Sequence, residues 1–98
     1  MKNNKLPVKI SKYVFKIKQK QFFALYHSLT GEIIFGQYLL AAIYKYFSKL
    51  NKVDNFLKLR ENRLSNNARK YLTELLALLL DKSFLSSNDN FEIGRAHV

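Results

Sequence analysis

The fold is decided by residues 12–36, which read KYVFKIKQKQFFALYHSLTGEIIFG. Apolar and charged residues alternate at the start of this segment, and period-2 alternation with aromatic and β-branched residues is typical of a half-buried strand. The polar break at residues 19–21 has the length of a hairpin loop, and Gly31 can adopt the positive φ that a tight turn needs. The segment therefore predicts three antiparallel strands, over residues 12–18, 22–28 and 32–35.

Apolar residues then recur at helical spacing, at positions i, i+1, i+4, i+8 and i+11 from Leu39. This pattern predicts an amphipathic helix over residues 38–50. Two further helices are expected to begin at capping side chains. Asp54 can cap a short second helix, and Ser65 or Asn66 can cap a long third helix.

The expected fold class is α+β, with a three-stranded antiparallel meander followed by three helices. Phe84 and Leu85 are expected to return to the core as a short last strand. This order of elements is that of a winged helix-turn-helix-like domain. We expect one domain over residues 12–87, preceded by a flexible lead-in over residues 1–11 and followed by a linker that starts at residues 88–91.

The end of the chain, residues 92–98, reads EIGRAHV. It resembles a translated sequencing adapter, because the codons GAG ATC GGA AGA GCA CAC GTC encode this peptide. We therefore expect residues 92–98 to be an artefact rather than native sequence, and the natural protein to continue beyond Phe91. Arg95 and His97 then carry no functional information.

The composition excludes several classes of protein. The hydrophobic fraction of 48%, with 14% aromatic residues, is that of a globular chain rather than a disordered one. The absence of cysteine excludes a disulfide framework, a thiolate zinc site and an iron–sulfur cluster within these residues. The longest apolar run, at residues 75–80, is far shorter than the ~20 residues of a membrane span, and no signal peptide is visible. We expect a cytoplasmic protein without membrane contact.

The net charge of +10 is unevenly distributed. Residues 1–20 contain seven lysines and no acid, and a second basic cluster contains Arg60, Arg63, Arg69 and Lys70. A basic surface attracts nucleic acid, anionic lipid or acidic peptides. Most of the basic residues are lysine, and the chain is also rich in asparagine. An AT-rich genome produces this composition without selection for binding. Nucleic acid is therefore the less favoured partner.

No catalytic constellation is found in the sequence. His27 is the only histidine before residue 92, and Ser28 beside it points to the opposite face of a regular strand, so the two cannot form a dyad. The acids are spread without paired-carboxylate or metal-ligand spacing, and the glycines serve turns. We expect no catalytic residue, no metal site and no cofactor in this segment, which is not itself an enzyme.

The third expected strand offers a binding surface. If the meander runs in sequence order, this strand is an edge, and it lacks the lysine or proline that blunts an exposed edge. Such an edge can accept an extended peptide by strand addition. The apolar stripe of the third helix is wider than one core face requires and could form the other wall of a groove. Alternatively, the rest of a longer protein covers the edge.

Four parts of the sequence carry a resemblance to a known family. They are ALYHSLTGEIIF at residues 24–35, an apolar helix after it, YLTELL at 71–76 and KSFL at 82–85. Together they resemble the N-terminus of radical SAM/SPASM peptide maturases. There a leader-recognition domain of the pyrroloquinoline-quinone chaperone type precedes the catalytic barrel. The resemblance implies that the leader region of a ribosomal precursor peptide adds to the third strand and packs against the third helix. It assigns the peptide contacts to Ile33, Ile34, Phe35, Arg69, Leu72 and Leu76.

Two points of that assignment stay open at this stage. Leu72 is either a groove residue or a core residue, because the sequence does not fix its side of the helix. The resemblance also implies an iron–sulfur cluster and S-adenosylmethionine in the missing barrel of the parent. The cysteine motif that binds the cluster is absent from this chain, so the reaction of the parent is untested.

Two other functions compete with peptide recognition. A DNA-binding winged helix would use Arg60, Arg63, Arg69 and Lys70 as phosphate contacts. The third helix, however, offers few polar side chains that could read base edges. The other alternative is a packing or interaction domain with no ligand of its own. We rank peptide recognition first, a packing domain second and DNA binding third.

Overall fold

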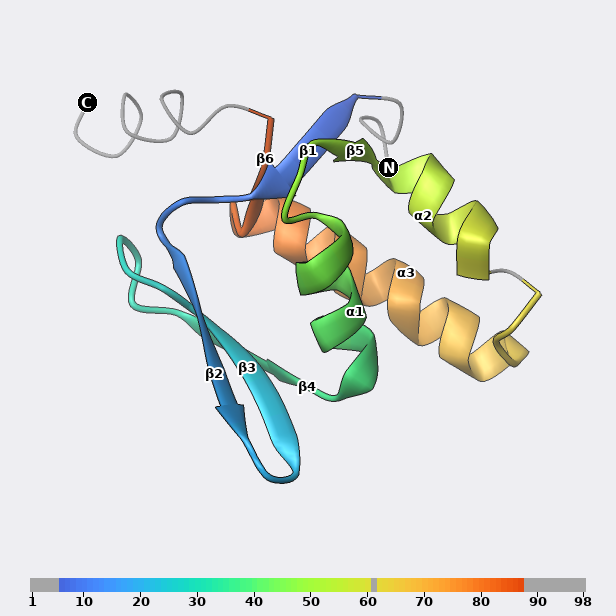
Figure 1. Cartoon of the computed structure of the whole chain (residues 1–98), viewed down its shortest axis with the longest axis horizontal. Helices are drawn as coiled ribbons and strands as arrows, with labels where there is room; N and C mark the ends of the chain where they lie inside the picture. Colours follow the sequence, from blue (N-terminus) through green and yellow to red (C-terminus); the bar gives the residue numbers. More distant parts are fainter. Residues whose placement is uncertain (1–5, 61, 88–98) are drawn as a thin grey trace.

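The computed structural model describes residues 6–60 and 62–87, which form two small antiparallel sheets and three helices (Figure 1). The elements follow in the order β1 (Pro7–Ile10), β2 (Val14–Gln19), β3 (Phe22–His27), β4 (Ile33–Gly36), α1 (Tyr38–Tyr46), β5 (Asn51–Lys52), α2 (Val53–Arg60), α3 (Asn66–Asp81) and β6 (Leu85–Ser86). One sheet has the strand order β2-β3-β4 and the other β5-β1-β6. This arrangement confirms the expected α+β fold class. The expected linker and the adapter-like tail, residues 88–98, lie outside the described residues.

β2, β3 and β4 form the predicted meander. β2 and β3 pair along six residues each, from Val14 opposite His27 to Gln19 opposite Phe22. The turn between β3 and β4 closes with a hydrogen bond of 2.8 Å from the N–H of Gly31 to the C=O of His27. Gly31 has a φ of +78°, at which a residue with a Cβ is strained, so this turn depends on glycine.

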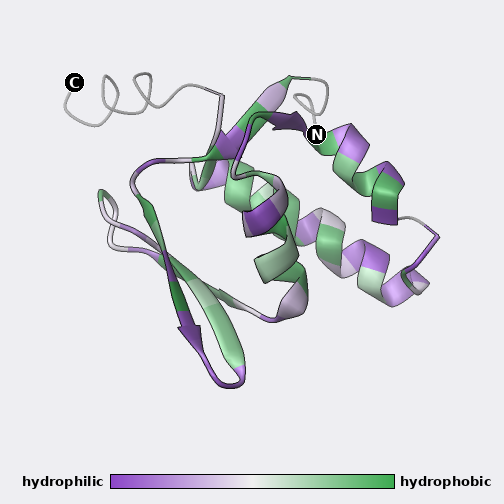
Figure 2. Cartoon of the chain, viewed as in Figure 1, coloured by the Kyte–Doolittle hydropathy of each residue, from purple (hydrophilic) through white to green (hydrophobic). Residues whose placement is uncertain are grey.

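The inner face of this sheet, which the helices cover, carries Val14, Leu25 and Ile34, none more than 9% exposed (Figure 1). Phe15 and Ile17 lie on the opposite, solvent-exposed face. The alternation in β2 is therefore present, but the apolar residues that alternate with its lysines do not face the core. Val14, the apolar residue on the lysine side of the strand, supplies the core contact instead. β3 contributes apolar residues to both faces and is hydrophobic along most of its length (Figure 2).

α1 follows β4 and packs on the inner face of the meander. Its buried residues are Leu39, Leu40 and Ile43. The buried residue Phe47 is the C-cap of the helix, and its N–H donates to the C=O of Ile43 at 2.9 Å. The expected extension of the helix to Leu50 is wrong: Leu50 is exposed, and the chain turns there into β5.

Gly36, the last residue of β4, lies against α1. A Cβ at this position would lie 2.5 Å from the Cβ of Leu40. Because that contact is too short for two carbon atoms, Gly36→Ala should force β4 and α1 apart and lower the free energy of unfolding by about 1–3 kcal/mol. Urea unfolding measures this loss, and Gln37→Ala, at the exposed neighbouring position, is the matched control. An unchanged urea midpoint for Gly36→Ala would contradict the close approach.

α2 and α3 complete the helical part of the fold. Ser65, one of the two predicted caps, is the N-cap of α3, and its Oγ accepts a hydrogen bond from the N–H of Ala68 at 3.2 Å. Asp54, the predicted cap of α2, lies in the first turn of that helix, which already begins at Val53. The core side of α3 consists of leucines that are at most 5% exposed, namely Leu72, Leu75, Leu76 and Leu79.

The second sheet was not expected from the sequence. β1 lies between β5 and β6, and its Val8 is 3% exposed. The N–H of Ile10 donates to the C=O of Phe47 at 2.8 Å, which ties β1 to the end of α1. The expected flexible lead-in over residues 1–11 is therefore wrong for residues 7–10, which belong to the folded unit.

The chain returns to the core at Phe84 and Leu85, as the sequence predicts. Phe84 is fully buried, and Leu85 begins β6. The C=O of Phe84 accepts a hydrogen bond of 3.0 Å from the N–H of Ser11, and its ring lies 5.3 Å from the ring of His27 in an edge-on arrangement. Phe84 thus joins the segment after β1 to the end of β3.

Candidate functional site

β4 is an edge strand, because among the described residues it pairs with β3 alone. The N–H of His27 donates to the C=O of Glu32 at 2.9 Å, so these residues form a hydrogen-bonded pair. Such pairs alternate along an antiparallel ladder, which places Ile34 in the next hydrogen-bonded pair with β3. The N–H of Ile34 therefore points to β3, and those of Ile33 and Phe35 point to the open edge.

The side chains of β4 make this edge apolar on both sides. Ile33 and Phe35 are 45% and 64% exposed, whereas Ile34 is 9% exposed and packs inward. The ring of Phe35 lies 5.8 Å from that of Phe22 on β3. β4 contains neither lysine nor proline, which are the residues that commonly protect an edge from pairing.

The two ends of α3 lie near the two ends of β4, in the opposite order along the chain. At one end, Nζ of Lys82 lies 3.2 Å from Oε2 of Glu32, the residue before β4. At the other end, an open cavity of about 750 Å³ separates the end of β4 from the first turns of α3. Its walls include Phe35, Tyr38, Ala68 and Tyr71. We call this cavity the β4–α3 groove.

Tyr71 supplies the apolar helix side of the β4–α3 groove, and Leu78 lies further along α3, toward Lys82. They are 45% and 40% exposed. They are seven residues apart, and Lys82 follows four residues later, so the three residues share one face of α3. Leu78 is one of the two residues, with Leu80, that make the apolar stripe wider than one core face requires.

Of the six expected peptide contacts, the structure brings Ile33 and Phe35 to the open edge. Ile34 lies on the same strand, but its side chain packs inward and its N–H points to β3. The three expected contacts on the helix do not reach the β4–α3 groove. Leu72 and Leu76 are fully buried in the core, so the open question about Leu72 is answered. Arg69 lines a different cavity, between α2 and α3.

Sequence reasoning did not assign Tyr71 or Ala68 to the peptide site, although both belong to the apolar stripe of the third helix. The core face and the groove face of α3 are adjacent on the helix surface. An apolar residue at the boundary between them fits either face. The signal that could have identified Tyr71 is its spacing of seven residues from Leu78, which marks a second apolar line along α3. Tyr38 was missed as well. It begins α1, whose core contacts come from Leu39, Leu40 and Ile43, and nothing in the sequence indicated that Tyr38 would line a cavity.

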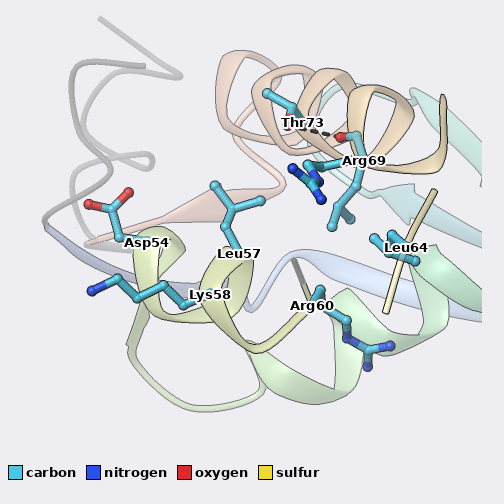
Figure 3. Close-up of a pocket in the computed structure, with 8 residues that line it drawn as sticks. Asp54, Leu57, Lys58, Arg60, Leu64, Arg69 and Thr73 are labelled. Carbon is cyan, nitrogen blue, oxygen red and sulfur yellow. Dashed lines mark hydrogen bonds between the residues drawn. The ribbon is translucent and has the colours of Figure 1, made fainter. Parts of the chain in front are cut away.

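The cavity between α2 and α3 has a volume of about 270 Å³ (Figure 3). Leu57 faces it from α2, and Arg69 and Leu72 line it from α3. Oγ1 of Thr73 donates a hydrogen bond of 3.0 Å to the C=O of Arg69, the dashed line in Figure 3. This hydroxyl is therefore engaged by its own helix.

The basic residues considered for DNA contact lie at the end of α2 and the start of α3. The guanidinium of Arg60 lies 5.4 Å from the centre of the Phe56 ring, in a cation–π arrangement. Arg63, Arg69 and Lys70 are exposed. They could contact phosphates, but the same part of α3 presents few groups to read bases.

His27 has a packing role. It is 1% exposed, and its Nδ1 accepts a hydrogen bond of 3.2 Å from the N–H of Leu29. The hydroxyl of Ser28 donates to the C=O of Tyr13 at 2.9 Å. In the part of the chain that the structure describes, no three His, Asp or Glu residues lie close enough to hold a metal ion. None of the helices in that part is long and apolar enough to cross a membrane.

Comparison with protein-family models, with curated proteins and with solved structures gives no match. The likeness of residues 24–35, 71–76 and 82–85 to leader-recognition domains therefore stays a prediction.

Proposed function

We propose that the chain is a peptide-recognition module that binds an extended peptide by strand addition to β4. The observation that carries this proposal is the open, apolar edge of β4, whose end faces the first turns of α3 across a cavity. The outward N–H groups of Ile33 and Phe35 give a peptide its main-chain partners. Main-chain bonds of this kind supply affinity, and the side chains of the groove supply specificity.

The groove favours apolar side chains in the peptide, because none of the residues that line it is charged. Alternate residues of an added strand point to opposite faces, so a side chain on one face would meet Tyr71 on α3. The lysines of β2 lie at the opposite edge of the sheet from β4. They would therefore affect the association rate and its salt dependence more than the specificity.

The biological peptide would be the leader region of a ribosomal precursor peptide. The likeness to the N-termini of radical SAM/SPASM maturases supports this part of the proposal. The module would then hold the precursor for a catalytic barrel that uses an iron–sulfur cluster and S-adenosylmethionine, and this chain would supply binding alone.

The test is a titration of the protein with the fluorescently labelled leader of a small peptide encoded beside the full gene. We expect a Kd of micromolar order, about −8 kcal/mol. Duplex DNA is titrated in parallel at two salt concentrations. Strong, salt-dependent binding to unrelated DNA without peptide binding would favour the winged-helix alternative and overturn the proposal.

A further inference from the structure

A second cavity adjoins the β4–α3 groove at the tip of the β2–β3 hairpin. It has a volume of about 390 Å³ and lies between the hairpin and the start of α1. The two cavities share four of their lining residues, namely Gln21, Phe22, Gln37 and Tyr38. They are therefore neighbours, and we call the second one the hairpin cavity.

The hairpin cavity is basic, whereas the β4–α3 groove is uncharged. Lys18 and Lys20 line the hairpin cavity, and both are exposed. Its other walls are neutral and include Phe23 and Ala41, and the tip of the hairpin is hydrophilic (Figure 2). An acidic side chain in this cavity would meet two ammonium groups and no carboxylate from the described residues that line it.

The hairpin and α1 contain no acid that would neutralise these lysines. Residues 1–53 include a single acid, Glu32, and it pairs with Lys82 before the first residue of β4. A third positive charge lies on the inner side of β2, where Nζ of Lys16 is 5.9 Å from the centre of the Tyr44 ring. The charge of the hairpin cavity is therefore complementary to an acidic ligand.

The tip of the hairpin projects past the end of β4. Gly36, the last residue of β4, lies opposite Phe23, so residues 19–22 lie beyond it. Most of β2 follows the opposite edge of the sheet, but this projection places Lys18 and Lys20 in a cavity next to the β4–α3 groove. A peptide that pairs with β4 and continues past its end would meet them.

We propose that the hairpin cavity binds acidic side chains of the same peptide that adds to β4, at the end of the peptide that continues past Phe35. The proposal rests on the function proposed above and specifies its ligand: an apolar segment that pairs with β4, with acidic residues at one end. Antiparallel addition to β4 places the N-terminal end of the peptide at the hairpin cavity, and parallel addition places the C-terminal end there.

A nucleic acid fits the two neighbouring cavities less well. Its phosphates follow one another along the whole strand. Lysines line the hairpin cavity, but no charged residue lines the β4–α3 groove. A peptide can be apolar where it lies in the groove and acidic where it lies in the hairpin cavity.

The test uses the full chain and three labelled peptides that share a seven-residue core of alternating leucine and threonine. One has three glutamines at each end, and in each of the other two glutamates replace the glutamines at one end. We expect one of the two glutamate peptides to bind about fivefold more tightly than the glutamine peptide, as two exposed ion pairs would provide. High salt should reduce this gain.

Lys18→Gln/Lys20→Gln should reduce the gain to about twofold or less and leave the affinity for the glutamine peptide unchanged. Lys52→Gln/Lys58→Gln is the matched control. It removes the same charge from exposed positions on β5 and α2, outside both cavities, and should keep the gain. Circular dichroism establishes that each variant is folded.

Equal affinity for the three peptides, or the same gain from glutamates at either end, would overturn the proposed role of the hairpin cavity and leave strand addition at β4 intact. A gain that both double variants reduce equally would also overturn it, because the gain would then be an effect of net charge. Failure of all three peptides to bind would overturn the proposed function, and the role of the hairpin cavity with it.

Discussion

Phe35→Pro should abolish peptide binding and leave the protein folded, whereas Ile34→Pro should unfold it. The difference follows from the hydrogen-bond register of β3 and β4. The N–H of Phe35 points to the open edge, so a proline there removes a donor that only an added strand uses. The N–H of Ile34 belongs to the ladder with β3, so a proline there removes a hydrogen bond of the sheet itself.

Phe35→Thr is the matched control, because it removes the ring but keeps the N–H. It should weaken peptide binding less than Phe35→Pro does. The measurements are peptide titration and circular dichroism on all three variants. A folded Phe35→Pro protein that binds the peptide as tightly as the wild type would contradict strand addition at β4.

Phe84→Ala should cost about 3–5 kcal/mol of the free energy of unfolding, the usual loss for a fully buried phenylalanine. Phe84 is fully buried and joins the segment after β1 to the end of β3. Small domains have about 5–15 kcal/mol of stability in total, so this single change should remove a large share of it.

Urea unfolding measures this loss. Phe35→Ala, at a position that is 64% exposed, is the control of the same residue type and should change stability by about 0.5 kcal/mol or less. Equal losses for the two variants would mean that Phe84 does not lie in the core.

The meander, α3 and the return of Phe84 to the core could all be predicted from local sequence. Gly31 identifies its turn, because few residues accept a φ of +78°. Ser65 identifies the start of α3, because its hydroxyl caps the helix. Each of these signals acts within a few residues of the structure that it determines.

The second sheet could not be predicted in this way. β1 pairs Val8 with Asn51 and Ile10 with Leu85, and these partners are far apart in the sequence. β5 and β6 have two residues each, too few for a periodic pattern. The pairing depends on how the helices pack, and no short window of the sequence contains that information.

The candidate site was predicted on its strand side and missed on its helix side. Ile33 and Phe35 follow from the strand's place in the meander, which sets the edge. The choice between Leu72 and Tyr71 depends on the rotation of α3 about its axis. That rotation is set by packing against α1, α2 and the meander together, and the apolar pattern of α3 is too wide to fix it.

The most direct test of strand addition is amide hydrogen exchange at Ile33 and Phe35, measured by NMR with and without the leader peptide. Both N–H groups point to the open edge of β4 and should exchange quickly in the free protein, then slowly in the complex. Ile34, whose N–H is already paired with β3, should be protected in both states. Peptide binding that leaves Ile33 and Phe35 in fast exchange would contradict strand addition at this edge.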